Sequence, residues 1–262
     1  MPSALTELAF HDGTTNVKDN EYLHDTKFKK LMARAVYRAI AKFVNGTKPF
    51  IPEPPQRIYA ESPIVGVLRV SWGSVEGATG YRVYISENGY GFDDGTPVST
   101  NSFEKRCLSP GLLFVKVTAT NEGGESLDSQ ILAVTIQDIR GWKPILIVNA
   151  FDRLDASVQI EMNRGNWIIP HAKSLFANGY FFESATNEAF VTDVETNHYA
   201  MIDWINGLES TKDETFSKEE QVKIADFLSK GGSLFVSGSE IAWDLDFKGD
   251  TDDKKFFSDW IR

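Results

Sequence analysis

The spacing at which apolar residues recur changes along this chain, and that change limits the folds it can adopt. In residues 57–137, short runs alternate apolar and polar side chains, which is typical of half-buried strands. Residues 142–262 instead combine a continuous apolar run at 145–148 with helical patterns. One amphipathic helix and a proline-rich segment precede both parts. We therefore expect a multidomain chain that joins an all-β part to an α/β part.

The alternating runs predict a β-sandwich. Three of them are strongly strand-like and are separated by glycine-rich turns: residues 67–72, 81–85 and 114–119. About seven strands in roughly 80 residues is the content of a sandwich of two antiparallel sheets. We therefore place this sandwich at residues 57–137.

The pattern after residue 142 predicts a doubly wound parallel sheet with right-handed crossovers. Strands are expected at 145–148, 180–182, 199–205 and 233–237, and helices at 170–178 and 217–229. Ser217 and Glu220 have the spacing of a capping box, and Gly231 and Gly232 end the helix that follows. Four strands are few for this architecture, and the sequence stops within a further helical pattern. We therefore expect this α/β part, residues 142–262, to be truncated.

The N-terminal stretch predicts a single amphipathic helix at residues 27–44. Its apolar residues recur at steps of three and four and share one face: Phe28, Leu31, Met32, Ala35, Val36, Ala39, Ile40 and Phe43. Asp25 can cap its start, and Gly46 supplies a left-handed stop. Prolines in 48–56 predict an extended linker, which leaves residues 1–47 as a separate piece too small to build its own core. An exposed apolar surface around Leu5 and Phe28 would then favour self-association.

The composition excludes several classes of function. The chain has 262 residues and a net charge of −10, which argues against nucleic acid or an anionic membrane surface as the main partner. A single cysteine, Cys107, excludes an intrachain disulfide framework and a multi-cysteine zinc site. No apolar run approaches the roughly 20 residues of a membrane span, and the first residues do not open a signal peptide. The acidic run 250–253 is more typical of a solvated loop than of a metal site.

Polar residues follow the expected parallel strands, at the edge of the sheet where ligands usually bind. They are Asn149, Asp152 and Arg153 after the first strand, Asn206 and Glu209 after the third, and Ser237, Ser239, Glu240 and Asp244 after the fourth. Carboxylates, one arginine and small hydroxyls can form a polar ligand pocket. The alternative is structural, because Glu209 and Glu240 can equally cap loops or pair with Arg153.

Residues 57–137 resemble a fibronectin type III domain. The resemblance rests on Trp72, on Leu108-Ser109-Pro110-Gly111 and on Val117-Thr118-Ala119-Thr120-Asn121. It implies that Trp72 is buried where this family places a tryptophan on its second strand. Leu113 or Phe114 stands where a tyrosine is expected, so the family's corner hydrogen bond is lost. Domains of this family usually act as spacers or binding modules.

Residues 203–210 and 231–245 resemble a class I glutamine amidotransferase-like domain. That family carries a nucleophilic cysteine on a tight turn directly after a glycine-led strand. No cysteine stands here, Ser237 and Ile241 flank Ser239 where a nucleophile elbow needs glycine, and no histidine follows Ser239. The resemblance therefore implies the fold and argues against the amidotransferase reaction.

Residues 2–44 resemble the closing segment of zinc-dependent N-acetylmuramoyl-L-alanine amidases, which cleave the peptide stem from peptidoglycan. Pro2, Leu5, Glu7 and Phe10, followed by a loop and a long helix, carry the resemblance. It implies that Glu7 matches the catalytic general base and that the intact parent holds zinc through two histidines and a glutamate. Those ligands would precede this segment, and His11 and His24 match no catalytic zinc spacing. No cofactor is therefore expected in this chain.

Three functional hypotheses follow from these observations. The first is a fragment of a secreted bacterial cell-wall hydrolase, extracellular or periplasmic in its parent form and inactive alone. The second is a non-catalytic module or spacer that binds peptidoglycan, another glycan or a protein. Tryptophans make sugar stacking conceivable, although Trp72 is expected in the core, and Trp204, Trp243 and Trp260 can lie there too. The third is a glycoside hydrolase acting through Glu209 and Glu240.

Overall fold

The computed structural model describes residues 22–23, 26–107, 109–136, 143–152, 166–209 and 214–261. These residues belong to two compact units. One holds helix α2 (Thr26–Asn45), and the other holds every strand of the described chain. The two units are described separately below.

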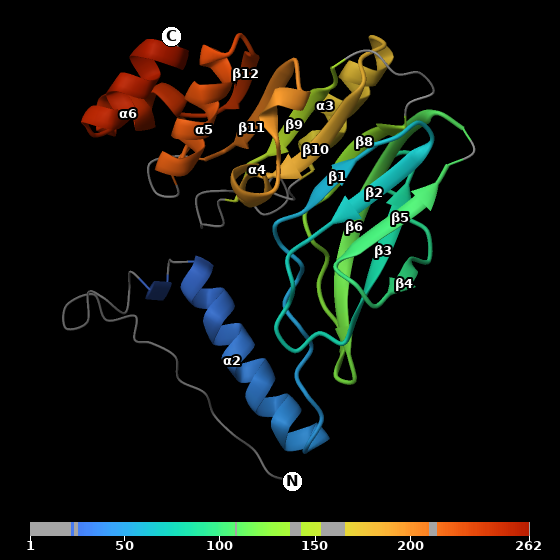
Figure 1. Cartoon of the computed structure of the whole chain (residues 1–262). Coiled ribbons are helices and arrows are strands. Elements are labelled where there is room, and N and C mark those ends of the chain that lie inside the picture. Colours follow the sequence, from blue (N-terminus) through green and yellow to red (C-terminus); the bar gives the residue numbers. More distant parts are fainter. Residues whose placement is uncertain are drawn as a thin grey trace, which may run out of the picture. The chain divides into compact units, whose positions relative to one another are not determined.

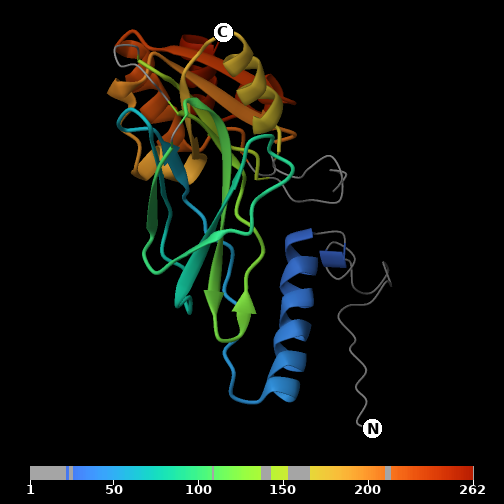
Figure 2. The same ribbon diagram turned by 90° about the vertical axis from the view of Figure 1, so that its right-hand side faces the viewer.

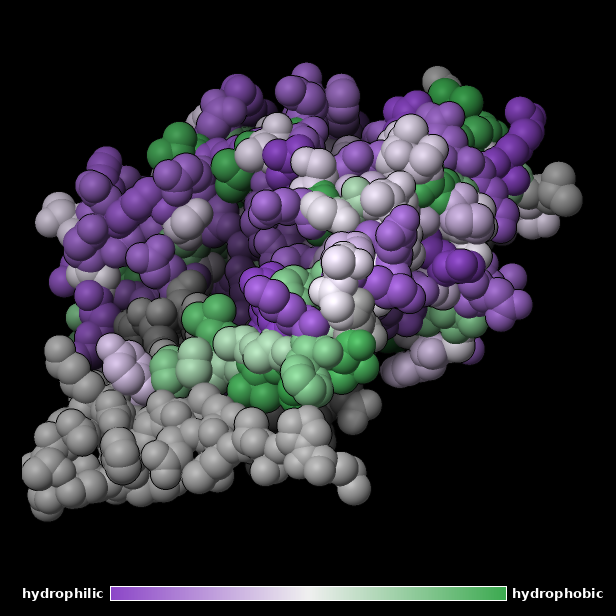
Figure 3. Space-filling model, turned by 90° about the horizontal axis from the view of Figure 1, so that it is seen from below, coloured by the Kyte–Doolittle hydropathy of each residue, from purple (hydrophilic) through white to green (hydrophobic). Residues whose placement is uncertain are grey.

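Helix α2 confirms the helix predicted at residues 27–44. It ends where expected, because Gly46 has a φ of +64° and its N–H donates to the carbonyl of Lys42. Near its start, the rings of Tyr22 and Phe28 stack with centroids 5.0 Å apart. The expected apolar face includes strongly exposed side chains, with Phe43 at 75% exposure. Figure 3 shows a band of hydrophobic residues on the side viewed from below.

The predicted β-sandwich is present. One of its sheets contains β3 (Gly80–Ser86), β4 (Thr96–Val98), β6 (Gly111–Asn121), β7 (Gly124–Glu125) and β8 (Leu132–Ile136), and the other contains β1 (Tyr59–Glu61), β2 (Val67–Ser71) and β5 (Ser102–Arg106). All strand pairs among these eight are antiparallel. Trp72, directly after β2, is buried and packs edge-on against Tyr81 at 5.3 Å. The burial expected for Trp72 is therefore confirmed.

Four parallel strands follow: β9 (Ile145–Asn149), β10 (Phe182–Thr186), β11 (Met201–Gly207) and β12 (Ser233–Gly238). They join the sheet of the sandwich that contains β1, β2 and β5, because β1 pairs antiparallel with β10 and Tyr59 lies opposite Ala185. The result is one seven-stranded sheet in the order β12-β11-β9-β10-β1-β2-β5. Both views show the sandwich strands running on into the parallel strands (Figure 1; Figure 2).

Helices cover both faces of the parallel strands. They are α3 (Ile168–Ala177), α4 (Asn187–Thr192), α5 (Lys218–Ser229) and α6 (Thr251–Phe256), together with the 3-10 turn η1 (Thr196–His198) and the π-helical segments η2 (Trp243–Lys248) and η3 (Phe257–Ile261). Successive residues of β9 point to opposite faces. Ile145 and Ile147 share one apolar core with α3 and the sandwich, whereas Leu146 and Val148 share a second core with α4, α5 and α6.

The structure differs from the sequence-based expectation in how the two large parts connect. The sequence separates residues 57–137 from 142–262, but residues 51–152 and 165–262 form one compact unit. Strand β8 of the sandwich also packs on β10 through side chains: Ser184 Oγ donates to the Ala133 carbonyl, and the Phe182 N–H donates to Thr135 Oγ1. A hydrophobic pattern shows that a strand is buried, but it does not show which strand lies beside it.

One strand begins later than predicted. The sequence places a strand at 180–182, whereas β10 spans Phe182–Thr186. Gly179 has a φ of +77° and ends α3, and Tyr180 is 55% exposed in the turn that follows. Tyr180 therefore belongs to the turn, and only the residues from Phe182 onward pair with β9.

Candidate functional site

The candidate site lies at the carboxyl ends of β9, β11 and β12. The order of the strands reverses there, because β10 lies on one side of β9 while β11 and β12 lie on the other. In open parallel sheets, ligands bind beyond the carboxyl ends of the strands at such a reversal. Of the residues predicted at the strand ends, the structure describes Asn149, Asp152, Asn206, Glu209, Ser237, Ser239, Glu240 and Asp244. Arg153, Glu7, His11 and His24 lie outside the described residues.

Glu209 joins the segment that follows β11 to the segment that follows β9. Its side chain is 2% exposed, and Oε1 accepts a hydrogen bond from the Asp152 N–H at 2.6 Å. Gly207 has a φ of +56°, and a Cβ there would lie 2.6 Å from the ring of Phe151. Only glycine therefore fits, and the buried ring of Phe151 fills the space beside it. This part of the edge is a packed polar junction.

Ser239 and Glu240 form the turn that follows β12. The Ser239 N–H donates to the Gly207 carbonyl, and Ser239 Oγ donates to the Glu209 carbonyl at 3.3 Å. Glu240 is exposed and has a φ of +60°, a conformation that residues with a side chain rarely adopt. Such strain is concentrated at ligand sites and tight functional turns.

The strained position in this turn is one residue later than the sequence analysis considered. Gly238 precedes Glu240 by two residues and Ala242 follows it by two, so small residues flank Glu240 and not Ser239. A Cβ on Gly238 would lie 2.7 Å from Cβ of Asn206, which shows how closely β12 approaches β11. The Gly-x-Glu-x-Ala spacing was the available signal for this turn, and an analysis that looked only for a serine or cysteine missed it.

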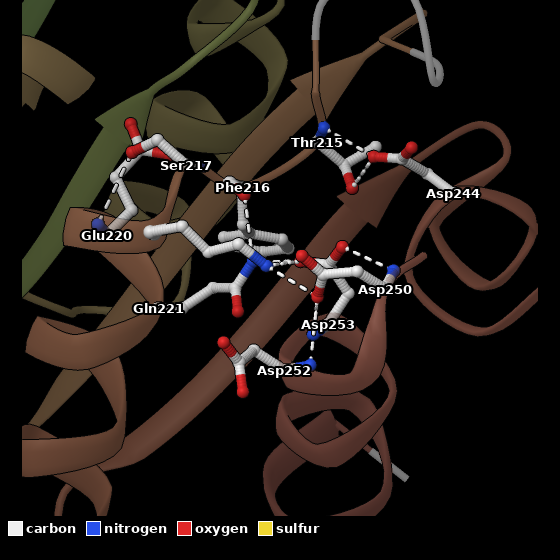
Figure 4. A network of polar contacts seen from close by, with 10 residues as sticks. Thr215, Phe216, Ser217, Glu220, Gln221, Asp244, Asp250, Asp252 and Asp253 are labelled. Atoms are coloured by element: carbon white, nitrogen blue, oxygen red, sulfur yellow. Dashed lines mark hydrogen bonds and ion pairs between the residues drawn. The ribbon is translucent and has the colours of Figure 1, made fainter. Parts of the chain in front are cut away.

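Asp244 lies apart from the strand ends and holds a loop. Its Oδ2 accepts hydrogen bonds from the Thr215 N–H at 2.8 Å and from Thr215 Oγ1 at 2.7 Å (Figure 4). Both bonds join η2 to the segment before α5. The contacts of Asp244 therefore position η2.

The acidic run at residues 250–253 builds a helix cap. Asp250 Oδ1 accepts from the N–H groups of Asp252 and Asp253, and Asp253 Oδ2 accepts from the Asp250 N–H (Figure 4). Lys218 Nζ donates to Asp250 at 2.8 Å and to Asp253 at 2.6 Å. This bond to Lys218 lowers the pKa of Asp250 to about 2. Among the described residues, no group of three potential metal ligands is present here or elsewhere.

Removal of the Lys218 charge is expected to raise the pKa of Asp250. In Lys218→Met, the carboxyl loses its ammonium partner and its pKa should move from about 2 toward the usual value of about 3.9. Since a lowered pKa stabilises the folded state above the unfolded value, this contribution is lost in wild type only as pH falls from about 4 to about 2. Carboxyl carbon shifts in an NMR titration measure the change. An unchanged Asp250 titration in this variant, matching that of the control Lys230→Met, would contradict the assignment.

An exposed aromatic pair lies on η2, beside the turn after β12. The rings of Trp243 and Phe247 stack with centroids 4.3 Å apart, and Lys248 Nζ lies 5.4 Å from each centroid. Trp243 is 45% exposed and Phe247 is 64% exposed. The core position considered for Trp243 is therefore wrong, and Trp260 is also 38% exposed, whereas Trp204 is fully buried. Trp243 and Phe247 are four residues apart, and this i, i+4 spacing was the sequence signal for the stacked pair.

The chemistry of this edge is suited to binding. Its described residues include an exposed glutamate, Glu240, on a strained turn and an exposed pair of rings a few residues further on. The contacts of Ser239 are to main-chain groups, and Glu209 is engaged by a main-chain N–H. In the described part of the chain, no helix is long and apolar enough to cross a membrane.

Comparison with known proteins gives similarity to one kind of domain. No family model and no curated protein matches the chain. A crystal structure of FN3tt is 17% identical, covers 34% of this chain and 99% of its own, and has a TM-score of 0.32. The fibronectin type III domain of human fibronectin type III domain containing protein 3 is 21% identical over 34% of this chain and 90% of its own, at 0.29. An Fn3-like protein from Clostridium thermocellum is 21% identical over 30% of this chain and 88% of its own, at 0.28. The chain is thus similar to fibronectin type III domains over about a third of its length.

Proposed function

We propose that residues 51–261 form a non-hydrolytic unit that binds peptidoglycan or a related glycan, as the accessory part of a bacterial cell-wall hydrolase. The observation that carries this proposal is Glu240, an exposed residue on a strained turn, followed by the exposed stack of Trp243 and Phe247. In this proposal, the fibronectin type III-like sandwich supports the binding edge through the shared sheet.

This edge has the two kinds of group that recognise sugars. A carboxylate accepts hydrogen bonds from sugar hydroxyls, and an aromatic ring packs against the apolar C–H face of a sugar ring. Glu240, Trp243 and Phe247 are spaced by three and four residues along a helical turn, in which the Asp244 N–H donates to the Glu240 carbonyl at 2.8 Å. The rings follow Glu240 by three and seven residues, and in this proposal one sugar unit contacts the carboxylate and the rings together.

Binding is favoured over hydrolysis by the contacts of the neighbouring groups. A glycoside hydrolase needs two carboxylates that flank one bond. Glu209 is buried beneath the turn with one oxygen on the Asp152 N–H, whereas Glu240 is exposed. These different surroundings suit Glu209 as a structural residue and Glu240 as a ligand contact. For this reason we favour a binding module over a glycoside hydrolase that uses both carboxylates.

The amidase part of the proposal concerns the N-terminal unit. The resemblance of residues 2–44 predicts a long closing helix, and α2 has the bounds expected for it. In the intact parent, which is extracellular or periplasmic in this proposal, Glu7 would be the general base. By the same resemblance, the parent holds zinc through two histidines and a glutamate, and we assign no zinc-dependent step to residues 2–44.

For the parallel strands, we propose the architecture of a class I glutamine amidotransferase-like domain without its reaction. The strand order β12-β11-β9-β10, with helices on both faces, supports a doubly wound sheet. The strained turn directly after β12 supports it further, since that family carries its nucleophile on such a turn. Here Glu240 occupies the position, and a carboxylate at this place serves ligand recognition in our proposal.

Retention on insoluble peptidoglycan tests the binding proposal. The purified chain is expected to sediment with peptidoglycan, and the double variant Trp243→Ala/Phe247→Ala should bind at least tenfold more weakly, because it loses the stacking surface of both rings. Tyr180→Ala is the matched control, since Tyr180 is an exposed aromatic on the turn before β10. Equal sedimentation of wild type and the double variant, or no retention of wild type, would contradict the proposal.

The same preparations test the hydrolase part separately. Incubation of the chain with peptidoglycan and added zinc is expected to release no stem peptides, because this chain holds no zinc-dependent step in our account. Zinc-dependent release would overturn the assignment of a non-hydrolytic role, whatever the binding result.

We also expect the apolar face of α2 to drive self-association of the isolated chain. Leu31, Ile40, Phe43 and Val44 are 62%, 58%, 75% and 69% exposed, which is a large apolar surface for one helix. Ile40→Glu/Phe43→Glu should shift the sedimentation coefficient toward that of a monomer. Lys42→Glu on the same helix controls for added negative charge. A wild-type chain that sediments as a monomer at all concentrations would contradict this expectation.

A further inference from the structure

A concave region lies on the α3 side of the parallel strands, away from their carboxyl ends. It is a hollow of about 550 Å³, and its walls include Ile145, Leu175, Met201 and Phe235. Ile145 and Met201 are the first residues of β9 and β11, so the hollow lies near the amino ends of the strands. Phe235 is 49% exposed beside it, which leaves an apolar wall open to solvent.

Two polar side chains of this hollow form an oriented pair. His171 Nδ1 lies 2.8 Å from Asp203 Oδ2, and the Asp203 side chain is 5% exposed whereas that of His171 is 21% exposed. A carboxylate can only accept, so Nδ1 carries the proton and donates it. In the neutral imidazole, Nε2 is then a hydrogen-bond acceptor. Within the described part of the chain, His171 makes no hydrogen bond through Nε2.

The cost of burying Asp203 points to a role for this pair. Its second oxygen, Oδ1, is buried and has no hydrogen-bond partner among the described residues. A buried carboxylate that is only partly satisfied lowers stability, and an apolar residue would fit better in a strand between two apolar neighbours. Such a group is retained where it orients another, as Asp203 orients the imidazole of His171.

We propose that this hollow binds a small apolar molecule that carries one hydroxyl group. The apolar walls would take the body of the ligand, and its hydroxyl would donate to Nε2 of His171. This site shares no residue with the glycan-binding edge at β12, so neither proposal depends on the other. The tautomer fixed by Asp203 sets which ligands are preferred. Nε2 forms a hydrogen bond with a ligand that has a donor, and it forms none with a ligand that can only accept.

A pair of probes that differ only in the donor tests this inference. The chain at pH 8 is titrated with 2-naphthol and with 2-methoxynaphthalene, whose methyl ether removes the donor. We expect 2-naphthol to bind about fivefold more tightly, the difference that corresponds to one neutral hydrogen bond. The imidazole nitrogen shifts of His171 should change at Nε2 on addition of 2-naphthol and much less on addition of the ether.

Two variants complete the test. His171→Leu should bind both probes with equal affinity, and Phe176→Ala, an exposed residue of the same helix, should keep the wild-type preference. Far-UV circular dichroism checks that each variant is folded. Equal affinity of wild type for the two probes, no binding of either, or a preference that survives in folded His171→Leu would each overturn the proposal.

Discussion

Replacement of Trp204 by alanine is expected to lower the free energy of unfolding by about 4 kcal/mol, the largest effect of any single substitution considered. Trp204 lies in the middle of β11 and is fully buried. Its ring packs edge-on against Phe190 at 5.2 Å and lies 5.1 Å from Phe216, so it joins α4, the sheet and the segment before α5. The indole N–H also donates to Asn206 Oδ1 at 2.8 Å. Alanine would leave a large cavity and an unpaired buried amide.

Denaturant unfolding followed by far-UV circular dichroism measures this loss. Trp204→Phe should cost less than half as much, because it keeps most of the ring contacts and loses only the N–H donor and part of the volume. Trp243→Ala is the matched control and should change stability by less than about 1 kcal/mol, since that ring is half exposed. A Trp204→Ala variant as stable as this control would contradict the position of Trp204 in the core.

Replacement of Glu183 by alanine is expected to cost about 3 kcal/mol, because this carboxylate joins β10 to the start of the sandwich. Glu183 Oε1 accepts from the Ser62 N–H at 2.8 Å, and Oε2 accepts from the hydroxyls of Tyr199 and Tyr59. Glu183 is 7% exposed. Alanine would therefore leave one main-chain donor and the tyrosine pair without this buried acceptor. Glu122→Ala, in the exposed turn after β6, is the control and should have little effect.

The same residue gives a prediction about pH. Burial raises the pKa of Glu183, against the hydrogen bonds from Tyr199 and Ser62 that lower it. A raised folded-state pKa stabilises the fold below the unfolded value of about 4.3, and this contribution is lost as pH rises through the folded value. Glu183→Gln removes that dependence. We therefore expect the stability of Glu183→Gln relative to wild type to improve between pH 4 and pH 8. A constant difference over that range would contradict the raised pKa.

The sequence predicts local structure well where a single segment determines it. The bounds of α2 follow from apolar spacing and from Gly46, whose left-handed backbone only a few residue types adopt readily. The capping box at Ser217 is present, with Glu220 Oε2 accepting from the Ser217 N–H at 2.7 Å. The burial of both faces of β9 was also predicted, because an uninterrupted apolar run cannot be half exposed.

Contacts between distant segments could not be predicted in the same way. The pairing of β1 with β10 joins residues more than 120 positions apart, and no period in either segment specifies that partner. The hydrogen bond between His171 and Asp203 likewise depends on how α3 lies on β11. The exposure of Trp243 depends on the short helical turn η2, which the sequence pattern did not indicate.

The sequence predicted that certain polar residues lie near the strand ends, but it did not predict the contacts that they make. The strand ends bring Asp152, Glu209 and Ser239 together through hydrogen bonds, since the Asp152 N–H donates to Glu209 Oε1 and Ser239 Oγ donates to the Glu209 carbonyl, as the rule for parallel sheets implies. Glu209 and Glu240 have different surroundings. Glu240 has a left-handed backbone in the exposed turn after β12, whereas Glu209 is buried. The close approach of Gly238 to Asn206, two residues before Glu240, is a contact between strands that a single sequence does not reveal.

The most direct test of the glycan-binding account is an NMR titration of the isotopically labelled chain with soluble peptidoglycan fragments. We expect saturable amide shifts centred on residues 238–247, together with shifts of the Trp243 indole N–H, and no comparable change in the sandwich strands. The Trp243→Ala/Phe247→Ala variant should lose these shifts while it keeps the rest of its spectrum. Saturable shifts confined to the sandwich, or none at millimolar fragment concentration, would contradict the account.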